Sequence, residues 1–244
     1  MTSIFAVDFP GHALQLFGPA HLAALTCIVL FNLFLLRYRG ASEEVRRTVR
    51  WTLALVLWLN EIAWHTWNLA VGRWTIQEML PLHICSLMVW LGGLMLVTKN
   101  YRIYEFSYFI GIAGALQALL TPNVGIYGFP HFWFFQTFIS HGLIVTSAIY
   151  MTTVEGFRPT WRSILRVVIV LNLYMVPVYF VNSAIGSDYL FVNSKPATAS
   201  LLDMLPPWPV YILYMEAIGL VMFGLLYLPF WIRDLRARPK VAIA

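Results

Sequence analysis

Two residues that could do nucleophilic chemistry, His83 and Cys85, stand near the start of a long apolar stretch of this sequence. A cysteine thiolate attacks an acyl carbon once a nearby histidine has taken the thiol proton. On a helix, residues two apart point about 200° apart around the axis, so His83 cannot easily serve Cys85. The base is therefore expected from another segment, and His65 and His141 are the candidates.

The composition places these residues in a membrane. Hydrophobic residues make up 60% of the 244 residues and charged residues only 11%, whereas soluble domains carry about 25% charged residues. This composition excludes an ordinary soluble globular domain. It predicts an all-α protein that crosses the membrane several times.

Seven apolar runs are each long enough to cross a bilayer, which takes about 20 residues. We expect them at residues 19–36, 51–70, 79–98, 103–121, 131–151, 163–184 and 208–231. They form one seven-helix transmembrane domain over residues 19–231. An extracytoplasmic lead-in at 1–18 precedes it, and a basic cytoplasmic tail at 232–244 follows. The Arg- and Glu-rich connection at 37–50 is expected to be a solvated loop.

The basic residues predict the orientation of these spans. Fourteen of the sixteen Lys and Arg residues fall on one side, and only Arg73 and Lys195 fall on the other. Cytoplasmic loops carry the excess of Lys and Arg. The N-terminus is therefore expected outside and the C-terminus in the cytoplasm, with the protein in the cell membrane. The net charge of +5 follows from this topology, so no nucleic-acid partner is expected.

Polar side chains gather between the middle of the predicted membrane region and its outer face. Such residues are costly there and indicate function by default. Besides Cys85, His141, His65 and Glu61, the set assigned to substrate binding is His83, Asn68, Gln136, Asn172, Asn182, Lys195, Tyr211 and Glu216. Each amide or tyrosine could equally hydrogen-bond neighbouring helices together, and Glu61 with His65 could be a buried structural pair. Their common depth predicts a polar cavity open toward the outer leaflet, because unpaired polar groups in hydrocarbon are costly.

Depth also bears on the choice of base and on the substrate. At 1.5 Å per residue, Cys85 lies about 8–10 Å below the outer interface, and His141 lies about 15 Å deep. His65 is nearer the depth of Cys85, so depth favours His65. A thiol at that level would meet the ester carbonyls of a lipid, while Lys195 and Arg73 could bind its phosphate.

Several motifs resemble the YwaF-like integral membrane proteins of bacteria. They are EIAWH at 61–65, LPLHIC at 80–85, FISHG at 138–142 and PWPVY at 207–211, within a similarity that covers about residues 15–230. The chain more distantly resembles the eukaryotic transmembrane acyltransferase that remodels ether phospholipids, and the androgen-induced-gene family of membrane lipid hydrolases. These resemblances imply a nucleophile at Cys85 and its histidine at His141, so they favour His141 where depth favours His65. We expect His141 to be the base, with His65 and Glu61 as orienting or substitute groups.

The expected function is therefore an enzyme acting on lipid acyl esters, by acyl transfer or hydrolysis, with a phospholipid or lysophospholipid as partner and no cofactor or metal. One alternative is a transporter or ligand-binding protein that uses Glu61, His65 and Glu216 as an intramembrane proton or ligand site. Another is a haem or metal protein that uses pairs among His65, His83 and His141.

Overall fold

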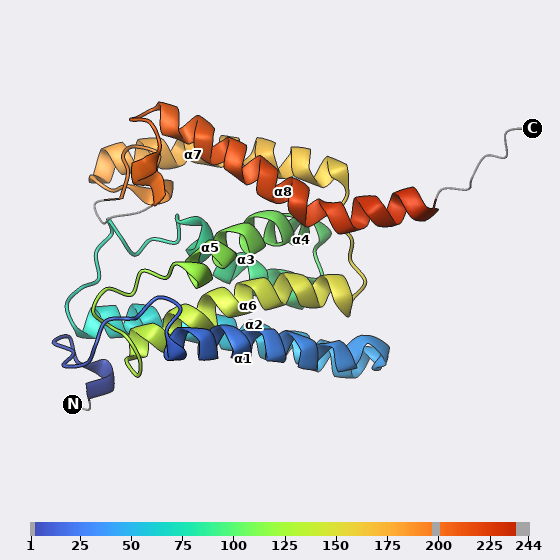
Figure 1. Cartoon of the computed structure of the whole chain (residues 1–244), viewed down its shortest axis with the longest axis horizontal. Coiled ribbons are helices and arrows are strands. Elements are labelled where there is room, and N and C mark those ends of the chain that lie inside the picture. Colours follow the sequence, from blue (N-terminus) through green and yellow to red (C-terminus); the bar gives the residue numbers. More distant parts are fainter. Residues whose placement is uncertain (1–2, 197–200, 238–244) are drawn as a thin grey trace, which may run out of the picture.

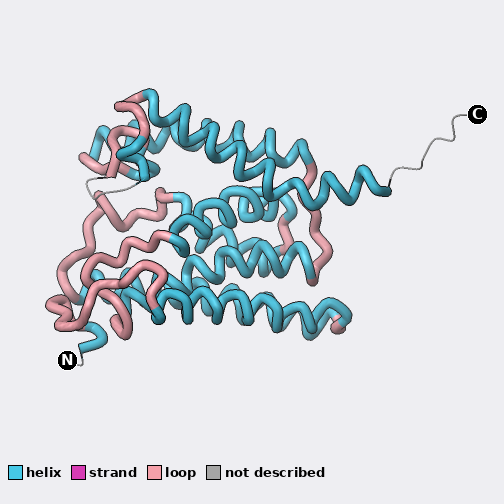
Figure 2. The backbone as a smooth tube through the Cα atoms, in the orientation of Figure 1, coloured by secondary structure: helices cyan, strands magenta, loops and turns pink. Residues whose placement is uncertain are grey.

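The computed structural model describes residues 3–196 and 201–237, and this part of the chain consists of helices joined by loops (Figures 1 and 2). Its α-helices are α1 (Pro19–Leu35), α2 (Glu43–Ala70), α3 (Ile84–Thr98), α4 (Tyr101–Phe106), α5 (Ile112–Leu120), α6 (Phe132–Thr153), α7 (Trp161–Ile185) and α8 (Val210–Ala237). A π-helical segment, Ser107–Gly111, joins α4 to α5 without a break. The result is seven helical rods.

Five of these rods are long and apolar enough to cross a membrane, namely Pro19–Gly40, Tyr101–Leu120, Phe132–Thr153, Trp161–Ile185 and Val210–Arg236. Helix α3 is also apolar but has only 15 residues, and α2 begins with a charged stretch. The protein is thus an all-helical, multi-pass membrane protein, as the composition predicted. The orientation, with the N-terminus outside, stays a prediction.

The rods run up and down, so their connections fall at two ends of the bundle (Figure 1). The connections at 36–42, 99–100 and 154–160 lie at one end, which we call the basic end because the Arg-rich stretch is there. The opposite end carries the N-terminal segment and the connections at 71–83 and 121–131. The predicted lead-in at 1–18 is described from residue 3. Of the predicted tail at 232–244, residues 232–237 continue α8 and the rest lie outside the described residues.

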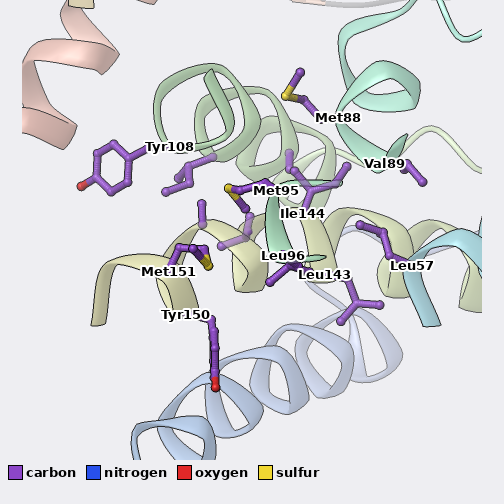
Figure 3. Close-up of a cluster of buried hydrophobic side chains, with 14 of the residues drawn as sticks. Leu57, Met88, Val89, Met95, Leu96, Tyr108, Leu143, Ile144, Tyr150 and Met151 are labelled. Atoms are coloured by element: carbon purple, nitrogen blue, oxygen red, sulfur yellow. The ribbon is translucent and has the colours of Figure 1, made fainter. Parts of the chain in front are cut away.

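The apolar core lies between α2, α3, the π segment with α5, and α6 (Figure 3). Leu57, Met95, Leu96 and Met151 are completely buried in it. Helices α7 and α8 lie together on one side of this core (Figure 1) and bury few side chains of their own. Most of the buried side chains therefore belong to α2 to α6.

Helix α3 starts later than the apolar run predicted. The span was expected at 79–98, but the helix begins at Ile84. Pro81 has no N–H and disfavours helical geometry in the residue before it. The residues before Ile84 instead bond to α7 and the loop after it, since Leu80 N–H donates to the Tyr189 hydroxyl and the Leu82 carbonyl accepts from Tyr174. Cys85 therefore stands in the first turn of its helix.

The charged stretch before the predicted second span is largely helical and ion-paired, so the prediction of a solvated loop over 37–50 was wrong. Ser42 caps α2 by accepting the Val45 N–H, and the helix starts at Glu43. Arg50 is only 4% exposed and binds both Glu43 and Glu155. The hydrogen bond from Arg50 holds the pKa of Glu43 below its usual range. That contribution to stability is present at neutral pH and is lost as the pH falls through the lowered pKa.

Glu155 is the centre of this ion cluster. Its fully buried carboxylate lies 2.5 Å from Arg50 and 2.7 Å from Lys99, so it joins α2, the end of α3 and the loop after α6. Breaking a buried pair leaves an uncompensated charge. We expect Glu155→Gln to lower the free energy of unfolding by about 3 kcal/mol. Thermal unfolding in detergent measures this, with Glu44→Gln, at an exposed position in the first turn of α2, as the control that should leave Tm unchanged.

Candidate functional site

A cavity of about 280 Å³ lies at the inner side of α2, α3, α5 and α6, and we call it the Cys85 cavity. It is lined by Glu61, Trp64, Cys85, Ser86, Val89, Ala118, Asn123, Trp133, Gln136, Thr137, Ser140 and His141. Four residues that the sequence selected therefore line one cavity: Glu61, Cys85, Gln136 and His141. Eight of the twelve lining side chains are polar, in a part of the chain that is otherwise apolar.

The backbone around Cys85 is suited to a nucleophile. The first intrahelical hydrogen bond of α3 runs from Leu87 N–H to the His83 carbonyl, at 2.9 Å. The N–H groups of Ile84, Cys85 and Ser86 therefore precede the helical ladder, as in any first turn. A helix N-terminus stabilises negative charge, so these N–H groups can stabilise the oxyanion that forms when a thiolate at Cys85 attacks an ester.

His141 presents a free ring nitrogen on the same cavity. Its Nδ1 lies 2.8 Å from the Thr137 carbonyl of the preceding turn. A carbonyl only accepts, so Nδ1 carries the proton, and in the neutral ring Nε2 then holds a lone pair. This is the form of histidine that can take a proton from a thiol.

Glu61 and His65 form a pair one helical turn apart, with Nε2 of His65 lying 3.5 Å from Glu61 Oε1. The Trp74 indole N–H donates to His65 Nδ1 at 3.0 Å. An indole only donates, so Nδ1 is the acceptor and the neutral ring carries its proton on Nε2, toward Glu61. His65 thus stands behind Glu61 and is not among the residues that line the cavity. Glu61 itself is close enough to Cys85 for the two groups to interact electrostatically.

Several residues predicted to bind substrate form hydrogen bonds within the protein. The Asn182 amide bonds the backbone of Tyr189 and the side chains of Ser187 and Asn193. Asn68 donates to the Trp64 carbonyl within α2. The Tyr211 hydroxyl donates to the Phe191 carbonyl. These bonds use the polar atoms within the protein, and a role in substrate binding stays a prediction for them.

His83 contacts the loop after α7, and Lys195 lies within that loop. His83 Nδ1 accepts the Leu190 N–H at 3.3 Å, and its ring packs on Tyr189 and Phe191. Lys195 donates to the Leu205 carbonyl at 2.7 Å. Burial raises the pKa of Tyr189, which keeps this hydroxyl protonated as it donates to the Ile76 carbonyl.

Asn172 and Glu216 line a second cavity of about 150 Å³, between α7, α8 and the start of α3. We call it the α7/α8 cavity. Its other lining residues are Ile84, Val168, Leu171, Met175, Leu190, Phe191, Val192, Ile212, Met215, Gly219, Leu220 and Phe223. Glu216 is thus in a different cavity from Glu61, so the three groups of the predicted transport site do not line one space.

Eight lining residues of the Cys85 cavity were not among the predicted site residues, namely Trp64, Ser86, Val89, Ala118, Asn123, Trp133, Thr137 and Ser140. For the lining residues on α6, the sequence did contain a pattern that could have identified them. The lining positions 133, 136, 137, 140 and 141 follow helical spacing, so they form the face that contains His141. Asn123 lies in the loop between α5 and α6, and helical spacing cannot place it.

The three histidines of the predicted haem or metal site have different surroundings. His141 lines the Cys85 cavity, His65 contacts Glu61 and Trp74, and His83 contacts the loop after α7. Among the described residues, no group of three or more His, Cys, Asp or Glu side chains is arranged to hold a metal ion.

Comparison with known proteins gives a family. A model of the TMEM164 family matches residues 16–227, which include every lining residue of both cavities. An uncharacterised protein of Treponema pallidum (strain Nichols) is 26% identical over 152 residues, which is 62% of this chain and 62% of that protein. The alignment therefore covers less than two thirds of the relative. No solved structure matches the chain.

Proposed function

Since this chain belongs to the TMEM164 family of membrane proteins, we propose that it is an enzyme acting on the acyl esters of lipids, with Cys85 as nucleophile and His141 as base. The observation that carries the proposal is that a first-turn thiol, Cys85, and a histidine, His141, line one cavity, with no hydrogen bond to His141 Nε2 from the part of the chain that the structure describes. A cysteine with a histidine base is a sufficient pair for acyl transfer.

The first half of the proposed reaction forms a thioester. His141 Nε2 takes the thiol proton, and the Cys85 sulfur attacks the carbonyl carbon of the ester. The oxyanion is stabilised by the N–H groups of the first turn of α3. The ester C–O bond then breaks, and the His141 imidazolium returns the proton to the leaving oxygen, which departs as a lipid alcohol.

The second half releases the acyl group. A hydroxyl of a second lipid, or water, gives its proton to His141 and attacks the thioester carbon. The C–S bond breaks, and the sulfur recovers the proton. Transfer and hydrolysis differ only in which of these two acceptors enters.

Glu61 acts in its neutral form in this mechanism. A carboxylate beside Cys85 would destabilise the thiolate, because like charges at short range repel each other. A carboxylic acid can instead donate a hydrogen bond to the ester carbonyl. His65, fixed by Trp74, orients it.

The substrate assay tests the proposal as a whole. The purified protein in lipid nanodiscs is incubated with a diacyl phospholipid and an isotope-labelled lysophospholipid, and the products are followed by mass spectrometry. We expect labelled diacyl lipid, free fatty acid or both. A preparation that leaves both lipids unchanged at every pH between 5 and 9 would overturn the proposal.

A second candidate, favoured by the Glu61–His65 contact, is a transporter or ligand-binding protein with an intramembrane proton site. The variant Glu61→Gln separates the two. A neutral amide keeps the shape and hydrogen bonding of a neutral acid, so we expect lipid-acyl turnover to stay within about tenfold of wild type. A proton site needs the titratable group itself, so proton-coupled flux or pH-dependent binding would be lost in Glu61→Gln and kept in Cys85→Ala.

A further inference from the structure

Two consecutive residues in the first turn of α3 face different cavities. Cys85 lines the Cys85 cavity and Ile84 lines the α7/α8 cavity. The α7/α8 cavity is apolar apart from Asn172 and Glu216. Only one turn of helix therefore stands between the sulfur and an apolar space.

Gly114 of α5 lies beside this turn on the inner side. A Cβ added there would be 3.8 Å from Cys85 Sγ and 3.8 Å from the Ile84 side chain. These are ordinary contact distances, so the glycine leaves room for about one carbon atom next to both residues. Ala118, one turn later on α5, lines the Cys85 cavity. The side of α5 that faces the sulfur is therefore made of small residues.

The α7/α8 cavity is elongated along its helices. Its lining on α8 runs from Ile212 to Phe223 and its lining on α7 from Val168 to Met175. Eleven residues of rise on α8 correspond to about 16 Å. An apolar cavity of about 150 Å³ accommodates a group of about the size of benzene. It therefore suits a segment of a hydrocarbon chain, because burying methylene groups is favourable.

We propose that the α7/α8 cavity holds part of the hydrocarbon chain of the acyl group that is bound at Cys85, and that the chain passes over Gly114. This inference rests on the proposed function. Eight of the twelve side chains that line the Cys85 cavity are polar, and polar groups next to hydrocarbon are left without partners. An apolar space lies on the other side of Ile84, so the chain leaves the Cys85 cavity in that direction.

The chain offers a matched pair of glycines on α8 for the test. Gly219 lines the α7/α8 cavity, whereas Gly224 lines neither that cavity nor the Cys85 cavity. A Cβ added at either one meets nothing within 4 Å, so both positions tolerate a larger side chain. Gly219→Leu should shorten the cavity, and Gly224→Leu should not.

The test measures alkylation of Cys85 and needs no turnover. In a Cys27→Ser background, the rate of labelling by N-ethylmaleimide is compared with that by N-dodecylmaleimide for wild type, Gly219→Leu and Gly224→Leu. We expect Gly219→Leu to slow the long reagent by about tenfold, because the added side chain overfills the space. Its rate with the short reagent, and both rates of Gly224→Leu, should match those of wild type.

Equal long-to-short ratios in Gly219→Leu and Gly224→Leu would overturn this inference, whether or not Cys85 is catalytic. If the substrate assay finds acyl turnover, the same variants give a second readout. Gly219→Leu should shift the preferred acyl chain to shorter lengths and keep the rate on short chains. If the assay finds no turnover, the proposed function fails, while the labelling ratios still report whether a chain on Cys85 enters the cavity.

Discussion

Replacing Cys85 by alanine should lower lipid-acyl turnover by about 1000-fold or more, because the residue that forms the covalent intermediate is lost. Alanine removes only the sulfur at a partly buried position, so the fold should persist. The rate is measured in nanodiscs with the lipid pair of the substrate assay. Comparable thermal unfolding of the variant and wild type shows that the loss is chemical.

Cys27 supplies the matched control. It is the only other cysteine and lines an apolar groove of about 790 Å³ between α1 and α6, away from the residues of the Cys85 cavity. Cys27→Ala should retain turnover within about twofold of wild type, as expected for an exposed substitution away from a site. Full lipid-acyl turnover in Cys85→Ala would show that Cys85 is not the nucleophile.

Replacing His141 by glutamine should have the next largest effect. General base catalysis contributes about 100-fold to 10,000-fold, and glutamine cannot take up a proton. We therefore expect turnover to fall by at least about 100-fold, with the lipid still bound, so the loss is in kcat and not in KM. The residual rate should rise with pH, because hydroxide then generates the thiolate without the histidine.

His65→Gln is the comparison that decides between the two histidines. His65 contacts Glu61 and Trp74 but does not line the cavity. Its loss should lower turnover by about tenfold, the scale of an orienting hydrogen bond. If His65→Gln were the more damaging variant, the base would be His65, as the depth argument favoured.

Much of the fold was predictable because hydrophobic runs determine the helices of a membrane protein. The positions of α1 and α6 agree with the predicted spans to within a few residues. The start of α3 was predicted five residues too early, because hydropathy counts Leu80 and Leu82 as apolar wherever they lie. Their backbone is bonded to Tyr189 and Tyr174, which are about a hundred residues away in the sequence.

The membership of the site was only partly predictable. Polarity in an apolar segment identified Cys85, His141, Glu61 and Gln136, and all four line one cavity. Polarity alone could not separate them from Asn182 and Tyr211, which bind the loop after α7. The difference depends on how each helix is rotated about its axis and on what it meets there. The rotation and the neighbours of a helix are set by tertiary packing, so the depth of a residue along its span does not predict them.

The central claim is a covalent acyl group on Cys85, and mass spectrometry of the protein tests it directly. The His141→Gln and wild-type proteins are quenched in acid after brief incubation with a diacyl phospholipid and then digested. The account predicts a peptide containing Cys85 that carries one fatty acyl group, released by neutral hydroxylamine and absent from Cys85→Ala. Steady lipid-acyl turnover with Cys85 unmodified under every quench condition, or with the acyl group on another residue, would contradict it.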